Sequence, residues 1–222
     1  MNKTLMILLL VLSSLHASAT NVSGGIYTST TWTLSNSPYI VTGDIVVFEG
    51  ARLLIEPGVE VLVNNNCKIE VRGQIAAIGK TAQKIVIKGN TSGNELMFWK
   101  GIIFIGTSDP LGRGDQAFFS HCNISNAQTC FDFNVAYHGP YIFRNCTFSY
   151  NNHINNDGGM GRMLFDSCRI VNNNYGFSYF QFGGRIANCV FDNNINGAEG
   201  SDTIVNCSFT NHSGIALQPY GY

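Results

Sequence analysis

Apolar residues recur in a fixed frame around five cysteines in the second half of this chain. An apolar residue stands three positions before each cysteine and another stands two positions after it, and successive cysteines are 18 to 24 residues apart. The five frames are Phe119-x-x-Cys122-x-Ile124, Phe143-x-x-Cys146-x-Phe148, Phe165-x-x-Cys168-x-Ile170, Ile186-x-x-Cys189-x-Phe191 and Ile204-x-x-Cys207-x-Phe209. Repetition at this period is typical of a solenoid, in which each repeat buries its apolar face only against its neighbours.

The first half of the chain contains short β-branched and aromatic runs separated by glycines, and no long segment has the period of a helix. Apolar and polar residues alternate within the runs, so Ile85 and Ile87 are expected to face inward and Lys84 outward. Strands this short are not stable as isolated hairpins, but they are stable when wound into coils that stack as parallel sheets. The pattern predicts an all-β solenoid of about seven or eight coils, spaced about 4.8 Å apart.

Asparagine residues follow the repeated frames at the places where the chain is expected to turn a corner. Asparagine tolerates left-handed backbone and forms local hydrogen bonds, and stacked asparagines can also bond along a stack. The corner asparagines are Asn126, Asn151, Asn172, Asn173, Asn193, Asn194 and Asn211. They predict that the corners as well as the core form ladders along the solenoid.

The repeated segments carry a family resemblance. The segments NCTFSYNN, SCRIVNNNYGF, NCVFDNNINGA and NCSFTNHSGI resemble the parallel β-helix repeats of the pectin-lyase-like, right-handed β-helix superfamily. The stretch from Trp32 through SPYIVTGDIVVFEGARLLIEPGVEV to GQIAAIG is similar to the opening coils of secreted bacterial β-helix proteins. The resemblance implies a right-handed parallel β-helix. It implies no particular activity, because such repeats encode only corners and core.

The N-terminal residues have the pattern of an export signal: a basic residue, a short apolar run and the small-residue cleavage site Ala17-Ser18-Ala19. The apolar run is shorter than the roughly 20 residues that a membrane-spanning helix needs. We therefore expect a signal peptide over residues 1–19, a lead-in or cap over 20–38 and a parallel β-helix domain over 39–222. The mature protein is expected to be secreted, periplasmic or on the cell surface, with no membrane span.

Seven cysteines in an exported chain ordinarily indicate disulfides. Cysteines at one repeat position, however, lie on neighbouring strands about 4.8 Å apart and point the same way, whereas a disulfide needs converging Cβ atoms about 3.5 to 4.5 Å apart. We therefore expect a ladder of buried free thiols. Cys67 and Cys130 fall outside the frame, and neither has the spacing of a zinc or haem site.

Charge excludes one class of partner. Charged residues make up 12% of the chain and the formal net charge is −1. No basic patch is dense enough to hold a phosphate backbone, so we expect no nucleic acid partner.

The family resemblance prompts a search for catalytic residues, because polysaccharide lyases of this fold use clustered acids, usually with calcium, and a nearby basic residue. Calcium takes six to eight oxygen ligands. The candidate residues on the expected outer face are Asp132, Asp157 and Glu199, with Arg162 and Arg185. A solvated outer face explains the same residues. No cofactor is expected otherwise, and calcium belongs only to the lyase hypothesis.

Aromatic residues near the expected corners give a second set of candidates. An aromatic side chain can stack on a sugar ring because it joins an apolar face to a polar tip. The candidate binding residues are Tyr137, Tyr150, Tyr175, Tyr179 and Phe180. Packing in the core or under loops is the competing interpretation.

These patterns favour an exported, non-catalytic β-helix that binds, or is displayed on, a polysaccharide-rich surface, with a polysaccharide or cell-surface glycan as partner. The first alternative is a polysaccharide lyase or glycoside hydrolase with a reduced groove. The second is a structural module or a truncated relative of a longer protein. The apolar segment Ile215-Ala216-Leu217 has no polar cap after it, which predicts self-association through the last coil.

Overall fold

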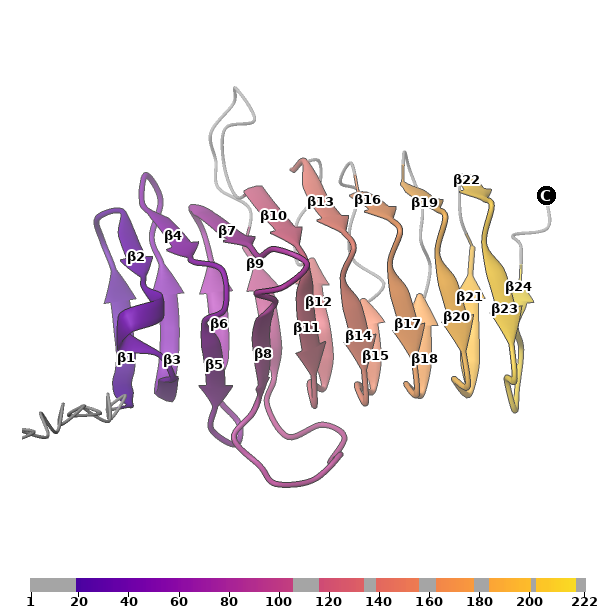
Figure 1. Cartoon of the computed structure of the whole chain (residues 1–222), viewed down its shortest axis with the longest axis horizontal. Coiled ribbons are helices and arrows are strands. Elements are labelled where there is room, and N and C mark those ends of the chain that lie inside the picture. Colours follow the sequence, from indigo (N-terminus) through magenta and orange to yellow (C-terminus); the bar gives the residue numbers. More distant parts are fainter. Residues whose placement is uncertain are drawn as a thin grey trace, which may run out of the picture.

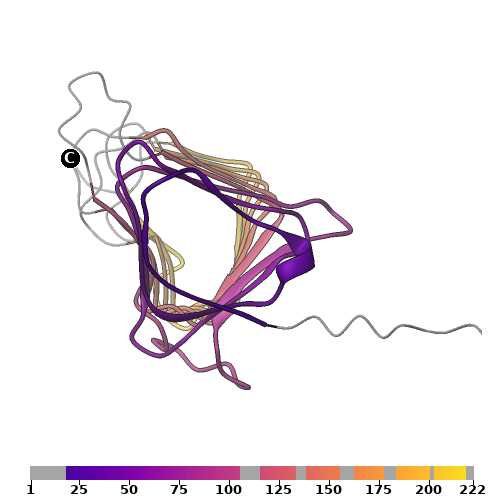
Figure 2. The same cartoon turned by 90° about the vertical axis from the view of Figure 1, so that its left-hand side faces the viewer.

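The computed structural model describes residues 19–105, 116–133, 139–155, 163–177, 184–200 and 203–218. In these ranges the chain is a parallel β-solenoid of about eight turns without α-helix, and its coils follow one another from β1 to β24 in Figure 1. Viewed along its axis the solenoid has a roughly triangular outline (Figure 2). The all-β fold and the number of coils predicted from the sequence are confirmed.

Three sheet faces form the sides of the triangle, and each is named here by its last strand. The β22 face contains β2 (Thr30–Trp32), β4 (Arg52–Ile55), β7 (Gln74–Ile78), β10 (Gln116–Ser120), β13 (Tyr141–Arg144), β16 (Met163–Asp166), β19 (Arg185–Ala187) and β22 (Thr203–Val205). The β23 face contains β3 (Tyr39–Val47), β5 (Glu60–Val63), β8 (Ile85–Gly89), β11 (Cys122–Ser125), β14 (Thr147–Ser149), β17 (Arg169–Val171), β20 (Val190–Asp192) and β23 (Ser208–Thr210).

The β24 face contains β6 (Lys68–Val71), β9 (Gly101–Phe104), β12 (Thr129–Phe133), β15 (His153–Asn155), β18 (Tyr175–Phe177), β21 (Asn196–Glu199) and β24 (Leu217–Gln218). The long strand β3 joins the β23 and β24 faces, because its first half pairs with β5 and its second half with β6. Alternation sets the inner and outer sides as predicted: Ile85 and Ile87 are fully buried and Lys84 is exposed.

Residues 20–38, expected as a lead-in or cap, contain two strands that join the stack. Strand β1 (Thr20–Ile26) pairs in parallel with β3, and β2 pairs with β4. Residues 20–38 therefore form a coil of the solenoid, with one short 3-10 helix, η1 (Leu34–Asn36), between β2 and β3. Alternation does not reveal β1, because it contains two consecutive glycines and few apolar residues. Residues 1–18 of the expected signal peptide lie outside the described ranges.

Rows of stacked side chains fill the interior. Phe119, Phe143 and Phe165 follow one another on β10, β13 and β16. Their ring centroids are 5.4 Å and 4.4 Å apart, and all three rings are fully buried. Such aromatic pairs add about 0.5 to 1.5 kcal/mol each to the stabilisation from burial itself. The apolar residue three positions before each frame cysteine thus belongs to the core row behind the β22 face.

The thiol ladder is confirmed. All seven cysteines are free, the frame cysteines are buried in four coils, and Cys207 in the last coil is half-buried. The amide N–H of Cys168 donates to Sγ of Cys189, and that of Cys189 donates to Sγ of Cys207, both at 3.4 Å. Burial raises the pKa of the Cys146 thiol and that of Cys130 far above the ordinary value, so neither supplies a thiolate.

A buried asparagine ladder runs beside the thiols. Asn151, Asn173 and Asn194 are each at most 2% exposed. Oδ1 of Asn173 accepts hydrogen bonds from the amide N–H and the side-chain amide of Asn151, and Oδ1 of Asn194 accepts the same pair from Asn173. His212 occupies this place in the last coil and bonds the carbonyl of Asn194 through Nδ1 at 3.2 Å. The ladder satisfies backbone groups that the corners would otherwise leave unpaired.

The last described coil is more open than the others. Ile204 and Phe209, which continue the core rows, are half-buried, while Ile215 is 51% and Leu217 43% exposed. Self-association through this coil stays a prediction. Within the described residues, no helix has the length and apolarity needed to cross a membrane.

Candidate functional site

An exposed aromatic pair lies on the β24 face. β15 and β18 place His153 directly beside Tyr175, whose side chain is 38% exposed, and the two rings stack with centroids 4.5 Å apart and planes inclined by 5°. The neighbouring coils put Thr129 next to His153 and Asn196 next to Tyr175. The stack therefore fixes the orientation of the Tyr175 ring, which lies between His153 and Asn196 on the adjacent strands.

A small hollow of about 50 Å³ adjoins the Tyr175 ring near the last coil. Asn196, Glu199 and Gln218 supply polar groups to its lining, and Phe177 and Ile215 supply apolar ones. The hollow thus combines two aromatic rings, two amides and one carboxylate. Tyr175 and Glu199 were named separately from the sequence, as a binding and a catalytic candidate, and the structure brings them to one place.

The two candidate acids that the structure describes, Asp132 and Glu199, do not converge. Asp132 lies on β12 and Glu199 on β21, with β15 and β18 between them. Three strand steps of about 4.8 Å separate the two positions by roughly 14 Å. One calcium ion binds its ligands at about 2.3 to 2.6 Å, so these two carboxylates cannot share an ion. Among the described residues no three His, Cys, Asp or Glu side chains are grouped as a metal site.

The remaining sequence candidates lie elsewhere or outside the described ranges. Arg185 is exposed at the start of β19, on the β22 face, whereas Asp132 and Glu199 lie on the β24 face. Tyr150 turns the corner after β14 with φ of 56°, the backbone conformation that asparagine adopts in neighbouring coils, and it is half-buried. The candidates outside the described residues are Tyr137, Asp157, Arg162, Tyr179 and Phe180.

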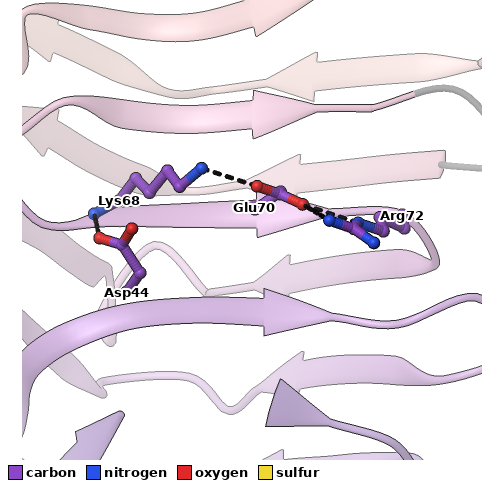
Figure 3. Close-up of polar contacts among 4 residues, drawn as sticks. All are labelled: Asp44, Lys68, Glu70 and Arg72. Carbon is purple, nitrogen blue, oxygen red and sulfur yellow. Dashed lines mark hydrogen bonds and ion pairs between the residues drawn. The ribbon is translucent and has the colours of Figure 1, made fainter. Parts of the chain in front are cut away.

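A charged cluster on β6 was not singled out from the sequence. Glu70 accepts hydrogen bonds from Lys68 Nζ at 2.7 Å and from Arg72 Nε at 2.6 Å, and Asp44 accepts one from the Lys68 amide N–H (Figure 3). Although Glu70 faces outward, its side chain is only 8% exposed because the two cations cover it. The signal in the sequence is the alternation Lys68-x-Glu70-x-Arg72, which places all three charges on one side of a strand.

The cluster fixes side chains rather than supplying a proton donor. Burial by itself would raise the pKa of the Glu70 carboxyl, but the hydrogen bonds from Lys68 and Arg72 outweigh burial and hold that pKa below its ordinary value. Glu70 is therefore ionised at neutral pH. Because Glu70 binds it, the Arg72 guanidinium is held in one orientation, with its carbon atom 5.4 Å from the centroid of the Phe48 ring.

Part of the chain is similar to Protein bark beetle of Drosophila melanogaster. The two are 34% identical over 113 residues, and the alignment covers 46% of this chain but 4% of the Drosophila protein. No family model and no solved structure matches the chain. The similarity therefore relates the solenoid to a short segment of a much longer protein and assigns no family.

Proposed function

We propose that this protein is an exported, non-catalytic β-solenoid that binds polysaccharide through the hollow beside Tyr175. The observation that supports the proposal is the composition of that hollow: an oriented, partly exposed aromatic ring together with Asn196, Glu199 and Gln218. Binding sites for small ligands typically combine apolar surface with a few polar groups that fix orientation. A sugar ring offers the matching features, an apolar face for the tyrosine and hydroxyl groups for the amides and the carboxylate.

The lyase or glycoside hydrolase hypothesis has less support. Glycosidases of the usual two-carboxylate type place the carboxyl groups about 5 to 9.5 Å apart. Asp132 and Glu199 are separated by about 14 Å along the stack. The structural-module hypothesis expects the protein to bind no ligand, and the binding experiment below tests this.

A binding assay on the purified chain tests the proposal. A glycan array would identify a neutral oligosaccharide ligand, and calorimetry would then compare the wild type with Tyr175→Ala. We expect the variant to bind roughly tenfold more weakly, equivalent to about 1.4 kcal/mol, because it loses the stacking surface. Ile195→Ala is the matched control, since Ile195 is 45% exposed beside Asn196 but does not line the hollow.

Three results would contradict the proposal. Equal affinities of wild type and Tyr175→Ala would move the binding site elsewhere, and the absence of any ligand on the array would leave the structural-module hypothesis. Release of unsaturated products from uronate polysaccharides, followed by ultraviolet absorbance with and without calcium, would show that the protein is an enzyme.

A further inference from the structure

Two adjoining hollows follow the β22 face far from Tyr175. The first has a volume of about 190 Å³ and is lined by Arg52, Arg72, Gln74, Ser29 and Glu49 among others. The second, of about 150 Å³, shares Arg52 and Gln74 and continues over Gln116, Phe118 and Ile142. Together they form one elongated depression, called here the Arg52 groove, that is basic and polar at one end and apolar at the other.

The basic end contains two guanidinium groups in different states. Arg72 is held by Glu70, which accepts hydrogen bonds from one edge of the guanidinium, and by the Phe48 ring beneath it. A guanidinium has five donors in a fixed plane, so donors on its other edge stay available. Phe48 is in turn stacked on the exposed ring of Tyr27, with centroids 4.4 Å apart. Arg72 is thus oriented before any ligand arrives.

Arg52 is the second guanidinium. It is exposed at the start of β4, and with the described residues it forms no ion pair within 4 Å. Glu49 is the one carboxylate in the lining of the first hollow, against the two arginines. The lining of this hollow thus contains two guanidinium groups and one carboxylate. An oxyanion is the group that two guanidiniums at one site recognise, because each can donate two parallel hydrogen bonds to it.

Strand register extends the groove along the axis. Gln74 lies between Arg52 and Gln116 on three adjacent strands. Phe118, on the same strand as Gln116, lies next to Ile142 on β13. From β4 to β13 there are three coil steps, or about 14 Å at roughly 4.8 Å each. The ligand that matches this shape is a chain lying along the axis, with an anionic group at one end and apolar surface at the other.

The position of the groove distinguishes a sugar chain from a peptide. β4, β7, β10 and β13 are consecutive strands of the β22 face, so each inner strand is paired on both sides. An extended peptide that binds by strand addition needs an unpaired sheet edge, and the strands that line the groove offer none. Guanidinium groups for an oxyanion, amides for hydroxyl groups and an aromatic ring for an apolar face fit an acidic oligosaccharide.

We infer that the Arg52 groove binds an acidic oligosaccharide, whose carboxylate or sulfate group pairs with Arg52 and Arg72. The inference shares the ligand class of the proposed function but concerns a different face of the solenoid, and it does not require the Tyr175 hollow to bind anything.

A matched series of probes tests the inference on the whole chain. Dextran, carboxymethyl-dextran and dextran sulfate share one backbone and differ in charge, so calorimetry with the three separates anion recognition from backbone recognition. We expect the charged forms to bind and Arg52→Gln to weaken their binding at least tenfold. The stronger of the two charged forms identifies the oxyanion. Arg144→Gln is the control, because Arg144 is an exposed arginine of the same face that does not line the groove.

Several outcomes would overturn the inference. Absence of binding by both charged dextrans would do so, and so would equal losses for Arg52→Gln and Arg144→Gln, which indicate unspecific attraction. Poly-glutamate binding as strongly as the charged dextrans would exclude an oligosaccharide as the specific ligand.

Unchanged thermal unfolding of Arg52→Gln checks that the variant is folded. If the groove is the site, Tyr175→Ala binds charged dextran as the wild type does. The Arg52→Gln and Tyr175→Ala variants therefore test the groove and the proposed function separately.

Discussion

At the scale of single residues, the Glu70 carboxylate is shielded by neighbours two positions before and after it in the chain. Lys68 and Arg72 cover Glu70 and leave its side chain 8% exposed, whereas Glu60 and Lys88, which pair across two strands at 3.0 Å, stay 38% and 37% exposed. Exposed pairs contribute about 0 to 1 kcal/mol, because water and salt screen them. The cluster around Glu70 is therefore the ion pair on the described surface with the larger structural effect.

The Glu70 cluster predicts a specific pH dependence. The folded-state pKa of Glu70 is lowered, so its stabilisation is complete above the unfolded pKa of about 4.3 and is lost as the pH falls through the folded value. We expect Glu70→Gln to lower the free energy of unfolding at pH 7 by about 1 to 2 kcal/mol. The variant should also lose less stability than the wild type between pH 7 and pH 3. Urea unfolding at the two pH values measures both.

Glu60→Gln is the matched control for this experiment, with an expected loss of at most about 0.5 kcal/mol because its ion pair is exposed. Equal losses for Glu60→Gln and Glu70→Gln at pH 7 would show that burial of the carboxylate has no energetic consequence.

At the scale of the structural element, the corners are held by side chains that replace backbone pairing. The corner residues Asn126, Asn172, Asn193 and Asn211 have φ between 53° and 66°, which confirms the left-handed backbone expected at these positions. One position further along the chain, the buried asparagines bond from coil to coil. Asn173 also donates to the carbonyl of Phe148 at 3.0 Å. Two of the corners, Asn172-Asn173 and Asn193-Asn194, are therefore specified by adjacent asparagines with different roles.

Substitution of Asn173 should show the value of the ladder. Asn173→Ala removes the side-chain hydrogen bonds to Phe148 and Asn194. It also leaves the buried backbone N–H of Asn151 without its acceptor. Because a buried unpaired group costs about 1 to 3 kcal/mol, we expect the free energy of unfolding to fall by about 2 to 4 kcal/mol. Chemical denaturation measures the change. Asn174→Ala is the control: its side chain is half-buried and bonds only Asn152 among the described side chains. A loss as large as that of Asn173→Ala would argue against a special role for the buried ladder.

At the scale of the whole molecule, stability is a sum over coils and their contacts. Each coil touches only the coils before and after it, so an inner coil contributes to two interfaces and an end coil to one. The core residues show the difference directly, since Phe148 is fully buried while Phe209, at the equivalent place in the last described coil, is half-buried.

The same truncation should therefore cost different amounts along the solenoid. We expect Phe148→Ala to lower the free energy of unfolding by about 3 to 5 kcal/mol and Phe209→Ala by roughly half as much. Thermal and urea unfolding of the two variants give the comparison. Equal losses would mean that the last coil is covered in solution, as it would be in a self-associated form. Size-exclusion chromatography at two concentrations would then show whether the chain is a monomer or self-associated.

The five cysteine frames allowed the core to be predicted in detail. In Phe143-x-x-Cys146-x-Phe148, all three side chains are at most 1% exposed, as the pattern indicated. The inside of a solenoid is readable because every strand repeats the alternation locally, and the free thiols follow from strand spacing alone. Strand β1, which begins at Thr20, is not visible in the pattern because glycine and polar residues hide its alternation.

The outer surface was predicted less well, for a geometric reason. Contacts there depend on which residues of neighbouring coils stand side by side, and coil length varies: Ala77 pairs with Phe119, 42 residues later, whereas Ala187 pairs with Val205, 18 residues later. No constant period brings Arg52 to Gln74 and then to Gln116. The groove was consequently not among the sequence candidates, and Asp132 and Glu199 were grouped although three strand steps separate them.

The sequence by itself determined the kind of fold, the inward residues, the free thiols and the asparagine corners, because each of these depends on short-range alternation that repeats in every coil. The tertiary structure alone decided which outward side chains meet, because their neighbours come from other coils and are selected by strand register. The Tyr175 hollow and the Arg52 groove arise in that second way, whereas the Glu70 cluster comes from alternation along one strand.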